Sequence, residues 1–432
     1  MRYQHRLLLL GVPAFLLCAC KKDKEPPPPV VTITAPFDGV DLTVPDTLRV
    51  EADVSGENPV DRVSFSLTNA NGVPIMAPVS VVPGSNTAHL SIDLPIISEQ
   101  LTGGECVLTA QAVSGDASAK DYVHFDIIPA PLRLRRLLVI ARPGGSATAI
   151  HIIDSTGTVS PASEIFMDLA GAVVSSAAQR IVLAGATQGP LVALAADGAQ
   201  TLWEIPNSGG GGTWTTALDL GADGRCWAGT ADNQLRGYNI TTGAVERNVP
   251  VGGGRRARAV CIAGERIVTA ESDALGSTWM AGTYQLSSGV AIAEHPLQQA
   301  VVAVFTRNND QVLFFGNQDG LGTVRDHNVN AGGGWEPYQW NSAITAVERV
   351  DAGTFLVALD DGSLERFSYP SSGSVPIADI PGVSDLALDP VSGLVYAAAG
   401  NDVVAIDPQT GQVPFTHAVG VPVAHVLPLL NR

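Results

Sequence analysis

The sequence is poor in charged residues, and in basic residues most of all. Only 16% of its 432 residues are charged, and 25 Lys and Arg stand against 42 Asp and Glu, for a formal net charge of −17. This acidic balance argues against nucleic acid or an anionic lipid surface as a partner. Sustained helical periodicity is also missing, whereas glycine reaches 45 residues. We therefore expect an all-β fold of short strands joined by many turns.

Local signatures of catalysis and of metal binding are missing too. No two of the eight histidines lie within five residues of each other, so no His-x-x-x-His pair is present. There is no Gly-x-Ser-x-Gly elbow and no phosphate-binding loop. The glycine runs at 209–212, 252–254 and 332–334 open no helix and indicate flexible connections. We therefore predict no catalytic residue, no metal site and no cofactor.

The first nineteen residues have the pattern of a targeting segment. Two arginines precede the apolar run Leu7–Leu17, which is too short to span a bilayer. The run ends at Leu17-Cys18-Ala19-Cys20, which resembles the lipobox of bacterial lipoproteins. The resemblance implies that Cys20 becomes the acylated first residue, anchored in the outer membrane of the cell envelope. Cleavage before Cys18 is disfavoured by the bulky Leu17, and an ordinary secretory signal is the alternative.

A tether and three further cysteines follow Cys20. Residues 20–29 contain charged residues and four prolines, which predict a stiff solvated spacer. With Cys20 acylated, Cys106, Cys226 and Cys261 remain, an odd number in scattered strands. Buried free thiols fit these positions better than a disulfide framework.

Residues 30–129 predict a first β domain. Apolar and polar residues alternate along Leu48–Val54, Asp61–Leu67, Cys106–Val113 and Tyr122–Ile128, with turn residues between them. The opening Ile-Thr-x-Pro-x-x-Gly resembles that of bacterial immunoglobulin-like sandwiches. Strand Leu48–Val54 carries no cysteine to pair with Cys106, which is a departure from antibody domains. The resemblance implies a spacer module.

Residues 132–432 repeat one unit. The first residues of its apolar second strands are 40 to 45 residues apart, the spacing of propeller blades with four strands each. These strands are apolar on both faces, as expected where neighbouring blades stack. The seven first residues are Arg136, Arg180, Arg225, Arg266, Gln311, Thr354 and Leu394.

The ends of the repeat region predict a closed wheel. The first repeat offers only Leu132–Arg135 before its second strand, and the chain ends on an unmatched strand, Val423–Leu430. We expect that strand to become the inner strand of the first blade of a seven-bladed β-propeller. Asp223–Glu246 is similar to pyrroloquinoline-quinone-type repeats, and Leu394–Val413 to repeats of surface-layer and lactonase-like propellers. These resemblances imply the fold only, and Gly-His and Trp-Asp signatures of the WD type are absent.

One face of the propeller is predicted to bind a partner. Two sets of loops emerge on this face: those from second to third strands, and those from each fourth strand to the next blade. In the sequence they look longer than the loops of the other face, and they contain more Arg, Trp and acidic residues. We call this side the predicted binding face. Alternatively, its tryptophans close the ends of blades. The nominated residues are Arg142, Trp214, Arg255, Arg256, Glu271, Asp273, Trp279, Asn317, Asp319 and Trp340.

These patterns favour a non-catalytic binding or scaffold protein that takes a protein or glycan partner at the cell envelope. A lactonase-like or quinoprotein-like enzyme, with its site at the channel mouth, is the alternative. Such an enzyme needs acidic or histidine side chains from several blades, and the sequence nominates no such set. His425, on the expected innermost strand, is the one histidine placed to face the channel.

Overall fold

The computed structural model describes residues 27–208, 210 and 212–432, so the targeting segment and Cys20 lie outside the described residues. The described residues divide into two compact units, one ending at residue 130 and the other comprising residues 131–432. Every regular element in the described part is a strand, apart from one short 3-10 turn, η1 (Gly252–Gly254). Across these residues, no helix has the length and apolar character needed to span a bilayer.

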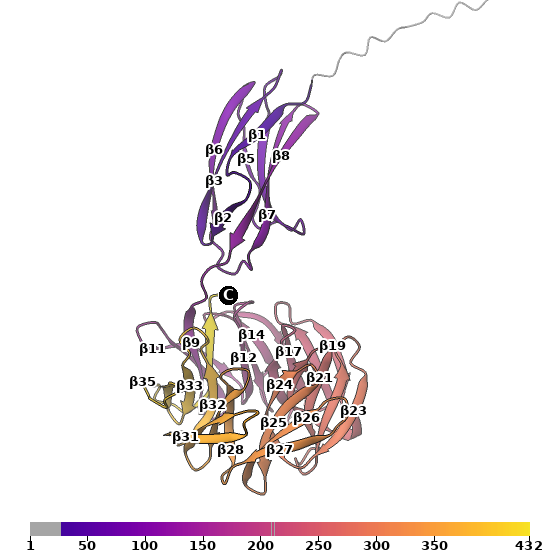
Figure 1. The fold of residues 1–432 in the computed structure, drawn as a ribbon, viewed down its shortest axis with the longest axis vertical. Helices are drawn as coiled ribbons and strands as arrows, with labels where there is room; N and C mark the ends of the chain where they lie inside the picture. The colour runs from indigo at the N-terminus through magenta and orange to yellow at the C-terminus, as the bar shows by residue number, and fades with distance from the viewer. Residues whose placement is uncertain (1–26, 209, 211) are drawn as a thin grey trace, which may run out of the picture. The chain divides into compact units, whose positions relative to one another are not determined.

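The first unit is a sandwich of two sheets (Figure 1). One sheet has the order β1 (Val30–Ala35), β3 (Asp46–Ser55), β6 (Thr87–Ile96). The other has the order β2 (Val40–Thr43), β8 (Ala117–Ile128), β7 (Gly104–Ser114), β4 (Arg62–Asn69), β5 (Val79–Val81). Alternate residues of β4, such as Val63, Phe65 and Leu67, are buried between the sheets. The predicted sandwich is confirmed.

The second unit consists of seven four-stranded sheets, the blades of a propeller. We number them by the chain order of their second strands. Blade 1 is β36 (Val423–Leu430), β9 (Leu134–Gly144), β10 (Ala147–Ile153), β11 (Val159–Phe166); blade 2 is β12 (Leu169–Ser175), β13 (Arg180–Gly185), β14 (Leu191–Ala195), β15 (Thr201–Ile205); blade 3 is β16 (Thr215–Leu220), β17 (Arg225–Thr230), β18 (Gln234–Asn239), β19 (Val245–Pro250); blade 4 is β20 (Arg256–Ala263), β21 (Arg266–Ser272), β22 (Trp279–Gln285), β23 (Ala291–Leu297). Blade 5 is β24 (Ala300–Asn308), β25 (Gln311–Gln318), β26 (Leu321–Asn328), β27 (Gly334–Gln339); blade 6 is β28 (Ile344–Arg349), β29 (Thr354–Leu359), β30 (Ser363–Ser368), β31 (Gly373–Asp379); blade 7 is β32 (Val383–Leu388), β33 (Val395–Ala399), β34 (Asp402–Ile406), β35 (Phe415–Ala418).

The second strand of each blade is buried on both faces. In β13, Ile181 and Leu183 belong to the core between blades 1 and 2, while Val182 and Ala184 belong to the core between blades 2 and 3. A strand between two stacked sheets meets apolar side chains on either side, so alternation disappears from its sequence. This explains the apolar runs from which the repeat was recognised.

The C-terminal strand closes the wheel, as predicted. β36 pairs antiparallel with β9, and Figure 1 shows the yellow C-terminal strand beside β9. The side chain of Asn431 accepts a hydrogen bond from the backbone N–H of Arg133 at 3.0 Å, which ties the end of the chain to the start of the unit. β36 also contacts the inner strands β32 and β12, so the seven inner strands form a closed ring around the central channel. Each of the seven described blades therefore has an inner strand, and β9 has a strand partner on both sides.

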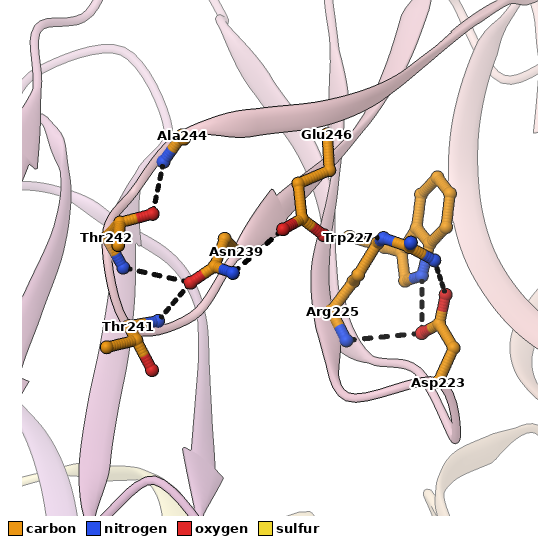
Figure 2. Close-up of polar contacts among 8 residues, drawn as sticks. All are labelled: Asp223, Arg225, Trp227, Asn239, Thr241, Thr242, Ala244 and Glu246. Carbon is orange, nitrogen blue, oxygen red and sulfur yellow. Dashed lines mark hydrogen bonds and ion pairs between the residues drawn. The ribbon is translucent and has the colours of Figure 1, made fainter. Parts of the chain in front are cut away.

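The repeated turn between third and fourth strands is fixed by one polar side chain (Figure 2). In blade 3 the Asn239 side-chain oxygen accepts the N–H groups of Thr241 and Thr242, at 2.9 and 3.0 Å. The Thr242 hydroxyl then accepts the N–H of Ala244. Asn and Asp favour such turns because their short side chains replace a backbone acceptor. Equivalent bonds are made by Asp154, Asn328 and Asp407.

A second set of contacts beside this turn holds the start of β17 (Figure 2). The Arg225 guanidinium lies between the carboxylates of Asp223 and Glu246, at 2.8 and 2.9 Å. The Trp227 indole N–H donates to Asp223 at 3.2 Å, so the buried ring keeps a partner for its polar group. These contacts fasten the start of β17 within blade 3.

The expected difference in loop length between the two faces is wrong. Among the described strands, five connections on the predicted binding face are only two residues long: 145–146, 167–168, 298–299, 319–320 and 400–401. The opposite face has two connections of that length, 264–265 and 309–310, and it also carries the long loops 389–394 and 407–414. Several nominated residues, including Glu271 and Asn317, lie inside strands rather than in loops. Glycine and turn residues mark the presence of a bend but not where the strand pairing ends.

Candidate functional site

Two residues expected to be exposed on the predicted binding face are buried. Glu271 has no exposed surface and Trp340 is only 2% exposed. The expectation of exposure is wrong for both, because each side chain serves the packing of its blade. As binding residues, the other nominated positions stay a prediction.

Glu271 is the centre of a buried polar network in blade 4. Its carboxylate accepts hydrogen bonds from the hydroxyls of Thr269 and Tyr284, at 2.7 and 2.5 Å. It also meets the guanidinium of Arg255 at 3.1 Å, and the same guanidinium reaches Glu294 at 2.6 Å. Burial raises the pKa of Glu271, while these donors act in the opposite direction. Arg255 is therefore used inside the fold, where its charge offsets two carboxylates.

Trp340 closes the end of blade 5. Its ring packs edge-on against Tyr338 and Phe367, with centroids 4.9 and 5.5 Å apart. Its N–H lies 2.9 Å from Glu365 and 3.1 Å from the hydroxyl of Ser374. This is the blade-closing role that the sequence left open for its tryptophans.

Three other nominated residues also make contacts within the propeller. The Arg142 guanidinium donates to the backbone oxygen of Leu169 at 2.9 Å. Asn317 bonds both the N–H and the backbone oxygen of Ile344, at 2.7 and 2.9 Å, and so joins blade 5 to blade 6. Half-buried Trp214 lies under the guanidinium of Arg236, 5.9 Å from the ring centroid. Asp319 sits in a two-residue turn with φ of 53° and is exposed.

The remaining nominated residues gather at one end of blade 4. Arg256 is the register partner of Ser272, and Ser272 is in turn the partner of Trp279. The loop 273–278 starts there, and it is the longest of the connections from a second to a third strand. It presents Leu275, which is 91% exposed. We call Arg256, Arg258, Ser272, Asp273, Leu275 and Trp279 the blade 4 corner.

The loop of the blade 4 corner is held by its own hydrogen bonds. The Asp273 carboxylate accepts the N–H of Ser277 at 2.7 Å and also bonds its hydroxyl. These bonds from Ser277 hold the pKa of Asp273 below its usual value. The Trp279 indole N–H donates to the backbone oxygen of Gly276 at 2.9 Å. A leucine side chain is thus presented to solvent by a preorganised loop, which reduces the entropy cost of binding.

A groove lies on the opposite face, between blades 7 and 1. It has a volume of about 560 Å³, within the range of small-molecule sites. One wall carries the rings of Tyr396, Phe415 and His417, with neighbouring centroids 6.3 and 5.2 Å apart. Phe415 is 40% exposed. Polar lining residues include Arg136, Asp154, Thr156 and Ser392. The groove can accept a small ligand with an apolar or aromatic face.

The central channel brings together acidic side chains that are far apart in the sequence. Each inner strand has a register shift near its start, at Thr215/Ala217 in β16 and at Ile344/Ala346 in β28, for example. Asp219 and Glu348 each lie four residues after the start of that shift, so they occupy equivalent places in blades 3 and 6. Bulges re-aim the side chains that follow them. Two scattered acids in the sequence gave no signal that they share one channel.

The channel carboxyls are strongly perturbed. Burial raises the pKa of Asp219 to about 7. The backbone N–H of Leu220 donates a hydrogen bond to its carboxylate at 2.7 Å, which lowers the pKa but does not offset the effect of burial. Burial raises the pKa of Glu348 to about 8, and the charges of Asp385 and Asp219 add to the effect. Asp385 lies 3.3 Å from His425, which the sequence had placed on the inner strand. Within the described residues, no three His, Cys, Asp or Glu side chains are grouped so that they could hold a metal ion.

The comparison of sequences assigns the first unit. Residues 29–110 match the family described as bacterial Ig domain. This part of the chain is a bacterial Ig-like domain. No curated protein matches the chain in sequence.

The comparison of structures concerns the second unit. The WD40 β-propeller domain of Doa1 superposes with a TM-score of 0.50 at 11% identity, over 61% of this chain and 86% of that one. The computationally designed Ika8 protein gives 0.47 at 16% identity over 67% and 90%, and U3-55K gives 0.46 at 15% over 61% and 82%. At such identities the likeness to Doa1 shows the fold alone, a WD40-like propeller. The resemblance of single repeats to pyrroloquinoline-quinone-type and lactonase-like propellers stays a prediction.

Proposed function

We propose that the protein is a non-catalytic binding or scaffold protein of the cell envelope, with its propeller holding a protein partner at the blade 4 corner. The observation that carries the proposal is Leu275, 91% exposed on a loop that Asp273 and Trp279 hold in place. When a partner covers a large apolar side chain that is ordered but exposed, the burial of apolar surface favours binding. The acylated Cys20 would keep the propeller at the membrane, and the Ig-like domain would serve as a spacer.

The proposal is tested by site-specific photo-crosslinking in intact envelopes. A photoreactive residue is placed at Leu275 and, as the matched control, at Val290, which is 61% exposed at the other end of the same blade. One defined partner band at position 275, with no such band at position 290, supports the function. Identical bands at both positions, or none at 275, would contradict it. Tryptophan fluorescence checks that the variants fold.

A second candidate function is a propeller enzyme with its site in the channel. The observation that favours it is the pair Asp219 and Glu348, whose raised pKa values make each carboxyl able to donate a proton near neutral pH. The pair Asp385 and His425 comes from two further blades. Purified protein is assayed against a panel of lactones and esters, with Asp219→Asn and Glu348→Gln as variants. Turnover that both variants abolish would replace the binding proposal, and no turnover by the wild type would end this alternative.

A further inference from the structure

The groove between blades 7 and 1 has an aromatic wall that the strand pairing of blade 7 builds. Ala405 is the register partner of both Tyr396 and Phe415, so the three side chains lie on one face of the blade. Tyr396 and Ala405 belong to the apolar core between blades 7 and 1, so this face is turned toward blade 1. The small Ala405 leaves room for the two rings, whose centroids are 6.3 Å apart. Phe415 continues the row outward and stays 40% exposed.

His417 extends this wall and packs against the neighbouring blade. Its ring centroid lies 5.2 Å from that of Phe415. Gly157, in a turn of blade 1, has a φ of 83°, and a Cβ at this position would lie only 2.9 Å from Cε1 of His417. The imidazole is therefore held between the two blades. In the described part of the chain neither of its ring nitrogens has a hydrogen-bond partner, so a ligand can use one as a donor and the other as an acceptor.

The rest of the lining contains polar groups whose charges balance. It includes two arginines, Arg135 and Arg136, and two aspartates, Asp154 and Asp389. A cleft lined by one sign of charge attracts ions of the other sign, and this lining has no such excess. Arg136 donates to a single backbone oxygen, that of Ala196 at 3.3 Å, which leaves further N–H groups of its guanidinium for a ligand. The groove therefore suits a neutral ligand that has both an apolar face and polar groups.

We propose that this groove binds a sugar ring of a glycan. A pyranose ring is neutral, packs the C–H groups of one face on an aromatic ring, and carries hydroxyls that both donate and accept hydrogen bonds. The exposed ring of Phe415 offers the apolar contact, while His417 and Arg136 offer the polar ones. A purely apolar ligand would bury these polar groups without partners, which is unfavourable.

This site goes beyond the proposed function. None of the residues that line the groove belongs to the blade 4 corner, and the groove lies on the opposite face of the propeller. The two proposals can therefore fail separately. A Leu275→Asp variant should bind sugars as the wild type does, whereas a change in the groove should leave crosslinking at position 275 intact.

The test is saturation-transfer NMR on the purified protein. The probes are the methyl glycosides of glucose, galactose, mannose and N-acetylglucosamine, with 3-phenylpropionate as an apolar acid for comparison. Phe415→Leu keeps an apolar side chain but removes the flat ring, and Phe415→Tyr keeps the ring. Phe166→Ala is the matched control, because Phe166 is 74% exposed on blade 1 and lies outside the groove lining. Tryptophan fluorescence checks folding, since no tryptophan lines the groove.

We expect the wild type, Phe166→Ala and Phe415→Tyr to bind at least one glycoside with similar affinity. Phe415→Leu should bind that glycoside about tenfold more weakly or worse, because the stacking face is lost. Absence of transfer from the wild type to every glycoside, or equal binding by folded Phe415→Leu, overturns the inference. Binding of 3-phenylpropionate with no glycoside bound also overturns it, and assigns the groove to an apolar acid instead.

Discussion

Replacing Asp219 by Asn should make the propeller more stable at alkaline pH and flatten the pH dependence of its stability. Asp219 is half-buried on the inner strand of blade 3, and burial raises its pKa to about 7 from an ordinary value of 3.8. The folded state therefore holds a proton that the unfolded chain releases. The contribution of Asp219 to the stability of the fold is therefore fully present below pH 4 and is lost as the pH rises through 7.

The size of the effect follows from the two pKa values. The difference between about 7 and 3.8 corresponds to ~4 kcal/mol of unfolding free energy, with ~2–3 kcal/mol of it falling between pH 5 and pH 7. Solvent in the channel reaches part of the side chain, which makes these figures upper bounds. Asn has the same shape and keeps an oxygen to accept the N–H of Leu220. Asn carries no charge at any pH, so the variant should not lose unfolding free energy between pH 5 and pH 7 on account of position 219.

Urea denaturation followed by tryptophan fluorescence measures the effect selectively. All six tryptophans lie at or beyond residue 203, so the signal reports on the propeller and not on the Ig-like domain. We expect Asp219→Asn to gain ~2–3 kcal/mol over the wild type between pH 5 and pH 9. Asp310→Asn, at an exposed turn, is the control and should follow the wild type. Parallel pH profiles for Asp219→Asn and the wild type would refute the assignment of a buried, proton-holding Asp219.

Three further predictions follow from the closure, from a blade end and from the N-terminus. Deleting residues 421–432 removes β36 and should sharply lower the melting temperature reported by tryptophan fluorescence; an unchanged curve would mean that β36 does not close the wheel. Trp340→Ala should cost ~3–5 kcal/mol of unfolding free energy in the same urea assay, because the ring is buried and hydrogen-bonded, and full stability with loss of partner crosslinking would instead make it a binding residue. Cys20→Ala should move the protein out of the membrane fraction in cell fractionation, whereas Cys18→Ala should leave it there; the reverse pattern would place the lipid on Cys18.

The sequence determined the architecture because the repeat is written in local patterns. Each blade must bury a second strand between two neighbours, so strands such as Arg180–Gly185 are apolar throughout and recur at the spacing of one blade. The unmatched strand Val423–Leu430 revealed the closure for the same reason, since a blade short of one strand leaves an edge unpaired. In the first unit, alternation along Asp61–Leu67 predicted a strand, and the structure has it as Arg62–Asn69 with one buried face.

Tertiary structure decided which polar and aromatic residues are exposed and which are paired inside the fold. Glu271 and Trp340 are residue types that are common in binding surfaces. In the structure they bond Tyr284 and Glu365, which lie on other strands, and the sequence does not show that these strands are neighbours. Asp219 and Glu348 are 129 positions apart in the printed sequence, and only the matching register shifts of two inner strands put them at equivalent places in one channel. Arg255 and Arg256 are adjacent, yet only the former finds carboxylates. Strand periodicity is a property of neighbouring residues, whereas exposure and charge compensation depend on contacts between residues that the chain brings together from afar.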